Sequence, residues 1–289
     1  NLVYLGSNDV NVQKTFLSAN ENSTKAQLIA LNAYEMTLGK NNQIPLISNL
    51  GRMPPFTQIT ETKIVASDRG KTFDLFGYSV GISGNYAIVA AYGEDHDTSG
   101  NNELSSAGSA YIFERDSTGN WSEVQKIVAS DRASNGQFGT SIAISGNYAI
   151  MGAYQDGPGS AYIFERDSTG TWSQVKKLVS SDIQADDRFY QVAIDSNYAI
   201  VGAQYEDDDA TGNNLLSNAG SVYIFERDST GNWSQLKKIV ASDRTSDDYF
   251  GYSVAISGNY FIVGANKEDH DASGNNGLSG AGSAYIFEG

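Results

Sequence analysis

Short apolar runs separated by turn-forming residues dominate the chain from about residue 79 onward. The first group of runs predicts four strands, over residues 79–83, 86–91, 109–115 and 121–129. Ser83-Gly84-Asn85 and the Asp-Ser-Thr-Gly-Asn sequence at 116–120 are polar, contain glycine and are typical of hairpin turns. Successive residues of Ala110–Phe113 are all apolar, so both faces of this strand are apolar. We therefore predict a strand that is buried between two sheets.

The fourth run of each group is more polar than the other three and carries lysine. The lysines concerned are Lys126, Lys176, Lys177, Lys237 and Lys238. Lysines on an edge strand discourage pairing with other chains. We therefore predict that the fourth strand forms the outer edge of each sheet.

The whole pattern repeats along the chain. Tyr-Ile-Phe-Glu occurs at 111–114, 162–165, 223–226 and 285–288, and the units start near Phe76, Phe138, Phe189 and Phe250. The second unit is shorter because one loop, 153–159, replaces the long stretch 91–108 of the first unit. Tandem units of four strands predict an all-β fold, a four-bladed β-propeller over 56–289, with a solenoid of stacked strands as the alternative.

A possible closing strand lies before the first unit. Residues 57–68 align with 233–243, the fourth strand of the third unit, whereas no fourth strand follows Ser283–Glu288. We predict that 57–66 pairs with Ser283–Glu288 and closes the ring within one molecule. If the same segment instead pairs with a neighbouring molecule, it gives a polymer.

The units resemble the FG-GAP repeat, the blade motif of integrin α-subunit heads and of many secreted bacterial proteins. The residues that carry the resemblance are Phe250–Ala255, Ile262–Ala265 and Gly282–Phe287 with their counterparts in the other units. The resemblance implies a propeller and suggests adhesion at a cell surface. In integrin-type repeats a calcium loop joins the first two strands, but here the connection is only Ser83-Gly84-Asn85 or an equivalent, so that site does not carry over.

Acidic loops instead join the second and third strands of units one, three and four. Oxygen donors alternate in them with the spacing of a half calcium loop, and a glycine allows the turn. The candidate Ca²⁺ ligands are Asp95, Asp97, Ser99 and Asn101; Asp207, Asp209, Thr211 and Asn213; and Asp269, Asp271, Ser273 and Asn275. A solvated acidic turn without a metal is the alternative. Both histidines, His96 and His270, occupy one equivalent loop position, where zinc or copper is a further candidate.

Charge and composition narrow the function. The 289 residues carry a net charge of −15, which argues against nucleic-acid and anionic-lipid partners, and no apolar run is long enough for a membrane span. There is no cysteine, which excludes thiol catalysis. Gly77-Tyr78-Ser79-Val80-Gly81 matches the nucleophile motif G-x-S-x-G, but 139–143 and 251–255 repeat it as strand sequence. We therefore predict that the protein is not an enzyme.

Residues 1–55 lie outside the repeats and form an arm. Asn1–Leu5 is expected to be a strand, whereas Lys25–Leu38 fits either a helix or a strand. We expect a secreted or cell-surface structural protein whose arm joins it to other copies of itself. The alternative is a calcium-dependent adhesin or lectin that binds glycans or surface proteins, with Tyr92, Tyr154 and Tyr205 stacking on sugars.

Overall fold

The computed structural model describes residues 2–6, 13–17, 60–68, 72–180, 182–273 and 277–289. The chain divides into two compact units, 1–62 and 63–289. In the first unit, β1 (Leu2–Gly6) pairs antiparallel with β2 (Gln13–Leu17), which confirms the strand expected at Asn1–Leu5. The segment 25–38, expected as helix or strand, lies outside the described residues.

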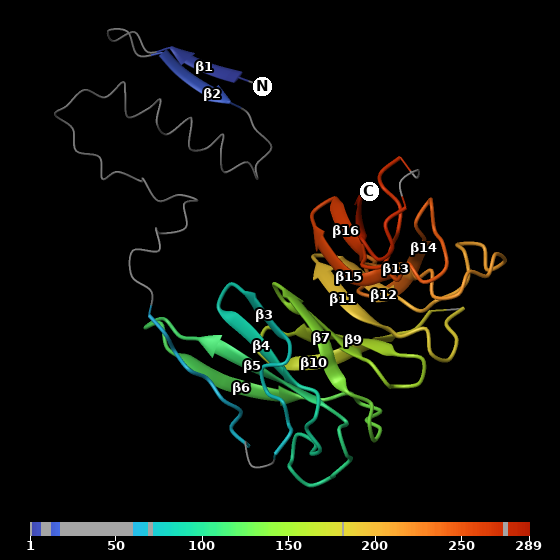
Figure 1. Ribbon diagram of the computed structural model, residues 1–289. Helices are drawn as coiled ribbons and strands as arrows, with labels where there is room; N and C mark the ends of the chain where they lie inside the picture. Colours follow the sequence, from blue (N-terminus) through green and yellow to red (C-terminus); the bar gives the residue numbers. More distant parts are fainter. Residues whose placement is uncertain (1, 7–12, 18–59, 69–71, 181, 274–276) are drawn as a thin grey trace. The chain divides into compact units, whose positions relative to one another are not determined.

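The second unit consists of four antiparallel sheets in which strands follow one another in chain order (Figure 1). The first sheet holds β3 (Val80–Ser83), β4 (Tyr86–Ala91), β5 (Ser109–Arg115) and β6 (Trp121–Ile127). The second holds β7 (Phe138–Ser145), β8 (Tyr148–Ala153), β9 (Ser160–Arg166) and β10 (Trp172–Leu178). The third holds β11 (Phe189–Asp195), β12 (Tyr198–Ala203), β13 (Ser221–Arg227) and β14 (Trp233–Ile239). The fourth holds β15 (Phe250–Ser257), β16 (Tyr260–Ala265) and β17 (Ser283–Glu288). These sheets are the predicted all-β propeller repeats.

Side chains alternate between the two faces of each strand, so a sheet places an apolar face against each neighbouring sheet. The core therefore lies between the sheets. Ile88 and Ile112 of the first sheet pack in one cluster with Met151 and Tyr162 of the second. On the opposite face of the second sheet, Ile163 packs with residues of the third sheet. The expected double burial of Ala110–Phe113 is confirmed, since all four residues are at most 2% exposed.

Glycine allows neighbouring sheets to approach closely where β13 begins. Gly220 has a φ of 85° and forms a β-bridge with Phe250 of the fourth sheet. A Cβ atom at Gly220 would lie 2.0 Å from the Phe250 carbonyl oxygen. This position therefore needs glycine both for its backbone conformation and for its space.

Residues 60–66, which precede the first sheet, make contacts that differ from the predicted ones. Residues 60–66 have no strand conformation, and Ile64 and Ala66 pack with Val89, Tyr111 and other residues of the first sheet. In the described part of the chain, β17 pairs only with β16, so the expected pairing with Ser283–Glu288 is not present. The physical reason is that 63–68 binds the first sheet as 126–131 binds the second, through contacts described below.

No helix occurs among the residues that the structure describes, and therefore none that could cross a membrane.

Candidate functional site

The acidic loops follow β4, β12 and β16, and each one is held by its own carboxylates. In the first loop, Asp97 Oδ1 accepts hydrogen bonds from the Ser99 amide (2.8 Å), the Ser99 hydroxyl (2.7 Å) and the Asn101 amide (3.2 Å). Asp95 Oδ1 accepts one from the Ser106 amide across the loop at 2.7 Å. The bonds from Ser99 and Asn102 hold the pKa of Asp97 well below its usual range. The loop is therefore an ordered turn with a fixed negative charge.

The other two loops repeat this arrangement. Asp209 Oδ1 accepts bonds from the Thr211 amide (2.7 Å) and hydroxyl (2.6 Å) and from the Asn213 amide (3.2 Å). Asp207 Oδ1 accepts the Asn218 amide at 2.7 Å. In the last loop, Asp271 accepts a hydrogen bond from the Ser273 amide (2.9 Å), and Asp269 accepts one from the Gly280 amide (2.6 Å). Asn275 lies outside the described residues. In each loop the second aspartate thus bonds to the serine or threonine two residues later.

The histidines of these loops contact a buried carboxylate. The Nδ1 atoms of His96 and His270 lie 3.0 Å from Glu94 Oε1 and Glu268 Oε1, respectively. Across the parts of the chain that the structure describes, no three His, Asp or Glu side chains form a group suited to a metal ion.

Two arginines that the sequence patterns did not single out clamp the acidic loops. Arg132 donates to the carbonyls of Asp95 (2.7 Å) and Asn102 (2.9 Å), and Arg244 donates to Asp207 (2.6 Å) and Asn214 (2.8 Å). Both arginines follow the aspartate of an Ala-Ser-Asp sequence after an outer strand, in an Asp-Arg pair. This repeated dipeptide is the signal that could have identified them.

Tyrosine pairs lie at the bases of the loops. One tyrosine from each of two pairs, Tyr154 and Tyr205, lines a polar cavity. Tyr154 packs edge-on against Tyr190 at 4.8 Å between ring centroids, and Tyr205 packs against Tyr249 at 5.1 Å. The cavity, of about 280 Å³, is lined by Tyr154, Ala185, Asp186, Asp187, Arg188, Tyr205, Asp207, Ser217 and Asn218. The Arg188 guanidinium lies 4.4 Å above the Tyr154 ring. Aromatic faces beside hydrogen-bonding groups can bind a polar ring.

Ion pairs link each of the first three sheets to the connection before it. Lys126 Nζ lies 2.6 Å from Asp68 and 3.4 Å from Glu94 in the first sheet. Lys238 lies 2.9 Å from Asp182 and 2.8 Å from Glu206 in the third. The second sheet repeats this with Lys177, which lies 2.7 Å from both Asp131 and Asp156.

A tyrosine hydroxyl completes the network. Tyr111 donates to Asp68 at 2.8 Å, and Tyr162 donates to Asp131 at 2.9 Å. The prediction that the outer-strand lysines act as edge protectors is therefore wrong for Lys126 and Lys238, whose side chains are 8% and 5% exposed. Lys176 and Lys237, by contrast, are exposed.

The serine of the apparent nucleophile motif makes a repeated structural contact. Ser79 Oγ accepts a hydrogen bond from the Ile142 amide of the second sheet at 3.2 Å. Ser141 Oγ accepts one from the Val192 amide of the third sheet at 3.1 Å. The motif therefore serves sheet stacking.

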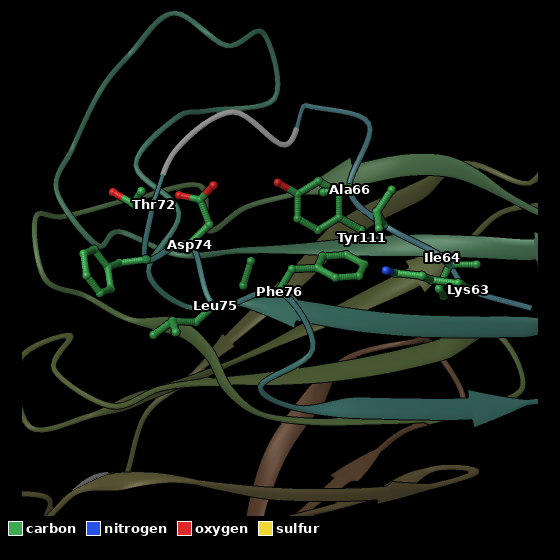
Figure 2. Close-up of a pocket in the computed structure, with 11 residues that line it drawn as sticks. Lys63, Ile64, Ala66, Thr72, Asp74, Leu75, Phe76 and Tyr111 are labelled. Carbon is green, nitrogen blue, oxygen red and sulfur yellow. The ribbon is translucent and has the colours of Figure 1, made fainter.

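The first sheet carries a cavity of about 660 Å³ on its side away from the second sheet (Figure 2). It lies among residues 63–66 and 72–76, Ala91 and Tyr111. Phe76, whose ring lies 5.5 Å from that of Tyr111, is only half-buried, whereas its counterparts Phe138, Phe189 and Phe250 are at most 1% exposed. In those later units the preceding sheet covers the phenylalanine.

The repeated units agree with a known family. The FG-GAP repeat matches residues 59–113, 121–164, 172–225 and 233–287. The chain belongs to the FG-GAP repeat family. The last three FG-GAP matches each run from an outer strand, through the connection, to the third strand of the next sheet. The Asp–Tyr hydrogen bonds of the first, second and fourth sheets thus each lie inside one FG-GAP repeat.

Two solved structures illustrate the similarity of this FG-GAP chain to known folds. A protein from Lactobacillus plantarum is 11% identical, with a TM-score of 0.44, over 73% of this chain and 55% of its own length. A functionally unknown protein from Desulfotomaculum acetoxidans is 16% identical, with a TM-score of 0.44, over 81% of this chain and 62% of its own length. The chain thus spans less than two thirds of both. No curated protein matches the sequence.

Proposed function

We propose that this chain is a non-enzymatic structural or adhesion protein that works outside the cell and assembles with copies of itself. The observation that carries the proposal is the exposure of apolar residues on the first sheet. Val80 and Ile82 of β3 are 66% and 69% exposed, whereas their counterparts Val192 and Ile194 of β11 are each 6% exposed. Exposed apolar surface of this kind favours contact with another protein surface.

The arm of residues 1–55 is the second element of this proposal. A strand that joins the sheet of a neighbouring molecule gains backbone hydrogen bonds and buried side chains. The exposed acidic loops would then line the surface of the assembly.

Light scattering coupled to size exclusion tests the proposal directly. We expect the full chain to form oligomers whose mass grows with concentration, and negative-stain images to show filaments or layers. A variant that lacks 1–55 should form smaller species if the arm contributes. A monomer over the whole concentration range would refute self-assembly.

The cavity between Tyr154 and Tyr205 supports a second candidate, an adhesin or lectin that binds glycans through the loop face. Sugars pack against aromatic rings, and Asp186, Asp187 and Asn218 offer hydrogen bonds beside them. We expect a glycan array to give hits that Tyr154→Ala abolishes. Tyr92→Ala is the matched control, because Tyr92 pairs with Tyr78 and does not line this cavity. Equal binding by both variants would refute this site.

Calcium binding by the acidic loops belongs to this second candidate. Its support is the alternation of oxygen donors in the sequence, and the loops are ordered through their own hydrogen bonds. Titration calorimetry of chelator-treated protein with millimolar Ca²⁺ provides the test, and the absence of heat would refute it.

A further inference from the structure

Asp243 lies on the connection before the fourth sheet, and Glu268 lies on the loop after β16. Together they repeat a site that lysine fills in the other three sheets. Tyr285 donates to Asp243 at 2.8 Å, as Tyr111 does to Asp68. The Glu268 side chain is 1% exposed and accepts bonds from the Ser283 hydroxyl (2.6 Å) and the His270 amide (2.7 Å). Within the described ranges no lysine pairs with Glu268, unlike Glu94 and Glu206. The two carboxylates thus surround a position that suits an ammonium group.

Among the described residues, no outer strand pairs with β17 of the fourth sheet. Tyr111, Tyr162 and Tyr223 stand directly opposite Lys126, Lys177 and Lys238 on the outer strands. Tyr285 of β17 has a partner strand only on the side of β16 among the described residues. Within this described part of the chain, the outer edge of β17 therefore presents unpaired strand backbone beside the two carboxylates.

Lys63 is the equivalent of the missing lysine. Lys-Ile-Val-Ala-Ser-Asp occurs at 63–68, at 126–131 and at 238–243. Asp68 already binds Tyr111 and Lys126 of the first sheet, as Asp131 binds Tyr162 and Lys177 of the second. Lys63 itself is exposed. Residues 63–68 therefore lie on the first sheet as if they came from the outer strand of a sheet before it.

The exposed faces of the first and fourth sheets complement each other. On the fourth sheet, Ile262 and Ile286 are 40% and 73% exposed, whereas their counterparts Ile88 and Ile112 are fully buried by the following sheet. On the first sheet, Val80 and Ile82 are exposed, whereas the residues at the equivalent positions of the later sheets face the preceding sheet. The exposed face of the fourth sheet is the one that a following sheet covers elsewhere, and the exposed face of the first sheet is the one that a preceding sheet covers elsewhere.

We propose that the fourth sheet of one molecule binds the first sheet of a second copy. Residues 60–64 of that copy pair with the outer edge of β17, and its Lys63 lies between Glu268 and Asp243. A second copy fits better than the same chain because the first and fourth sheets share no core cluster, and docking leaves every existing sheet contact intact. Such a head-to-tail interface leads to a ring or a filament. This inference rests on the proposed self-assembly and names its contact.

Single cysteines test the register, because the natural chain has none. Lys237 stands opposite Ile224 in the third sheet, so Thr62 is expected opposite Ile286. Opposed residues on antiparallel strands are close enough for a disulfide. Mixing the Thr62→Cys and Ile286→Cys variants under mild oxidation should give a mixed disulfide dimer. The matched control replaces Ile286→Cys by Ile262→Cys, which lies on the same face but on β16, and should give little.

The outcomes separate this inference from the proposed function. Oligomers without the 62–286 disulfide would overturn the inference and leave self-assembly standing, whereas a monomer at all concentrations would overturn both. If the double variant forms the disulfide within one chain at high dilution, the strand closes its own molecule and the second copy is refuted. The double variant Ile224→Cys/Lys237→Cys is the positive control for disulfide formation in this register.

Lys63→Ala tests the ion site separately. It leaves Glu268 buried without its ammonium partner, so association should weaken by roughly thirtyfold or more. Lys237→Ala, at an exposed outer-strand position, is the matched control and should associate like the natural chain. Equal association of both variants would overturn the placement of Lys63 between Glu268 and Asp243.

Discussion

Lys238→Ala should be among the most destabilising single substitutions in the repeats. The Lys238 ammonium lies 2.8 Å from Glu206 and 2.9 Å from Asp182, and the Glu206 side chain is 1% exposed. Removing the ammonium leaves a carboxylate buried without its counter-charge, which costs about 3–5 kcal/mol of unfolding free energy. In a unit of this size, that loss lowers the melting temperature by roughly 6–20 °C.

Urea and thermal denaturation followed by circular dichroism at pH 7 measure this effect. Lys237→Ala is the control, because Lys237 is exposed and its loss should change the free energy by less than about 0.5 kcal/mol. The double variant Lys238→Met/Glu206→Gln removes both charges and should recover much of the stability. If Lys238→Ala costs no more than Lys237→Ala, the ion pairs do not hold the sheets and the reasoning fails.

Three further predictions concern other parts of the fold. Burial, with a smaller contribution from Glu206, raises the pKa of Asp187 to about 7. Because this value lies above that of the unfolded chain, stability falls as the pH rises toward 7, so Asp187→Asn should raise the melting temperature at pH 8 and leave it unchanged at pH 3. Gly220→Ala should cost at least about 1 kcal/mol more in urea denaturation than Gly119→Ala, since both have positive φ but only Gly220 lacks space for a Cβ. If the acidic loops bind calcium with a Kd of about 0.1 mM, 10 mM Ca²⁺ should add about 2.7 kcal/mol of stability; an unchanged melting curve would contradict binding.

The sequence predicted the strands well because each strand is coded by its own residues. The predicted spans 86–91 and 109–115 coincide with β4 and β5, since apolar runs and glycine-containing turns are local signals. The acidic loops were also located correctly as repeated turns. Their ability to hold calcium depends on oxygen positions that a spacing pattern does not determine.

The roles of the lysines could not be predicted from the outer strand alone. Lys176 and Lys177 are adjacent in sequence, yet only Lys177 reaches carboxylates, on the connection before its sheet and on the loop after β8. These partners come together only when the sheets stack. The closing strand was misplaced for a related reason, because its alignment identified an outer strand but not which sheet its final residues contact.

The tyrosines of the first, second and fourth sheets each donate to the connection before their sheet, and in the third sheet Lys238 pairs with Asp182 of that connection, so the repeats depend on their nearest neighbours. An interior sheet is held from two sides, whereas a sheet at either end of the series has one such neighbour. Stability in stacked repeats is approximately a sum of nearest-neighbour contributions. Amide hydrogens in β9 and β13 should therefore exchange with solvent more slowly than those in β17, and opening of the molecule should begin at the outermost sheets and spread inward.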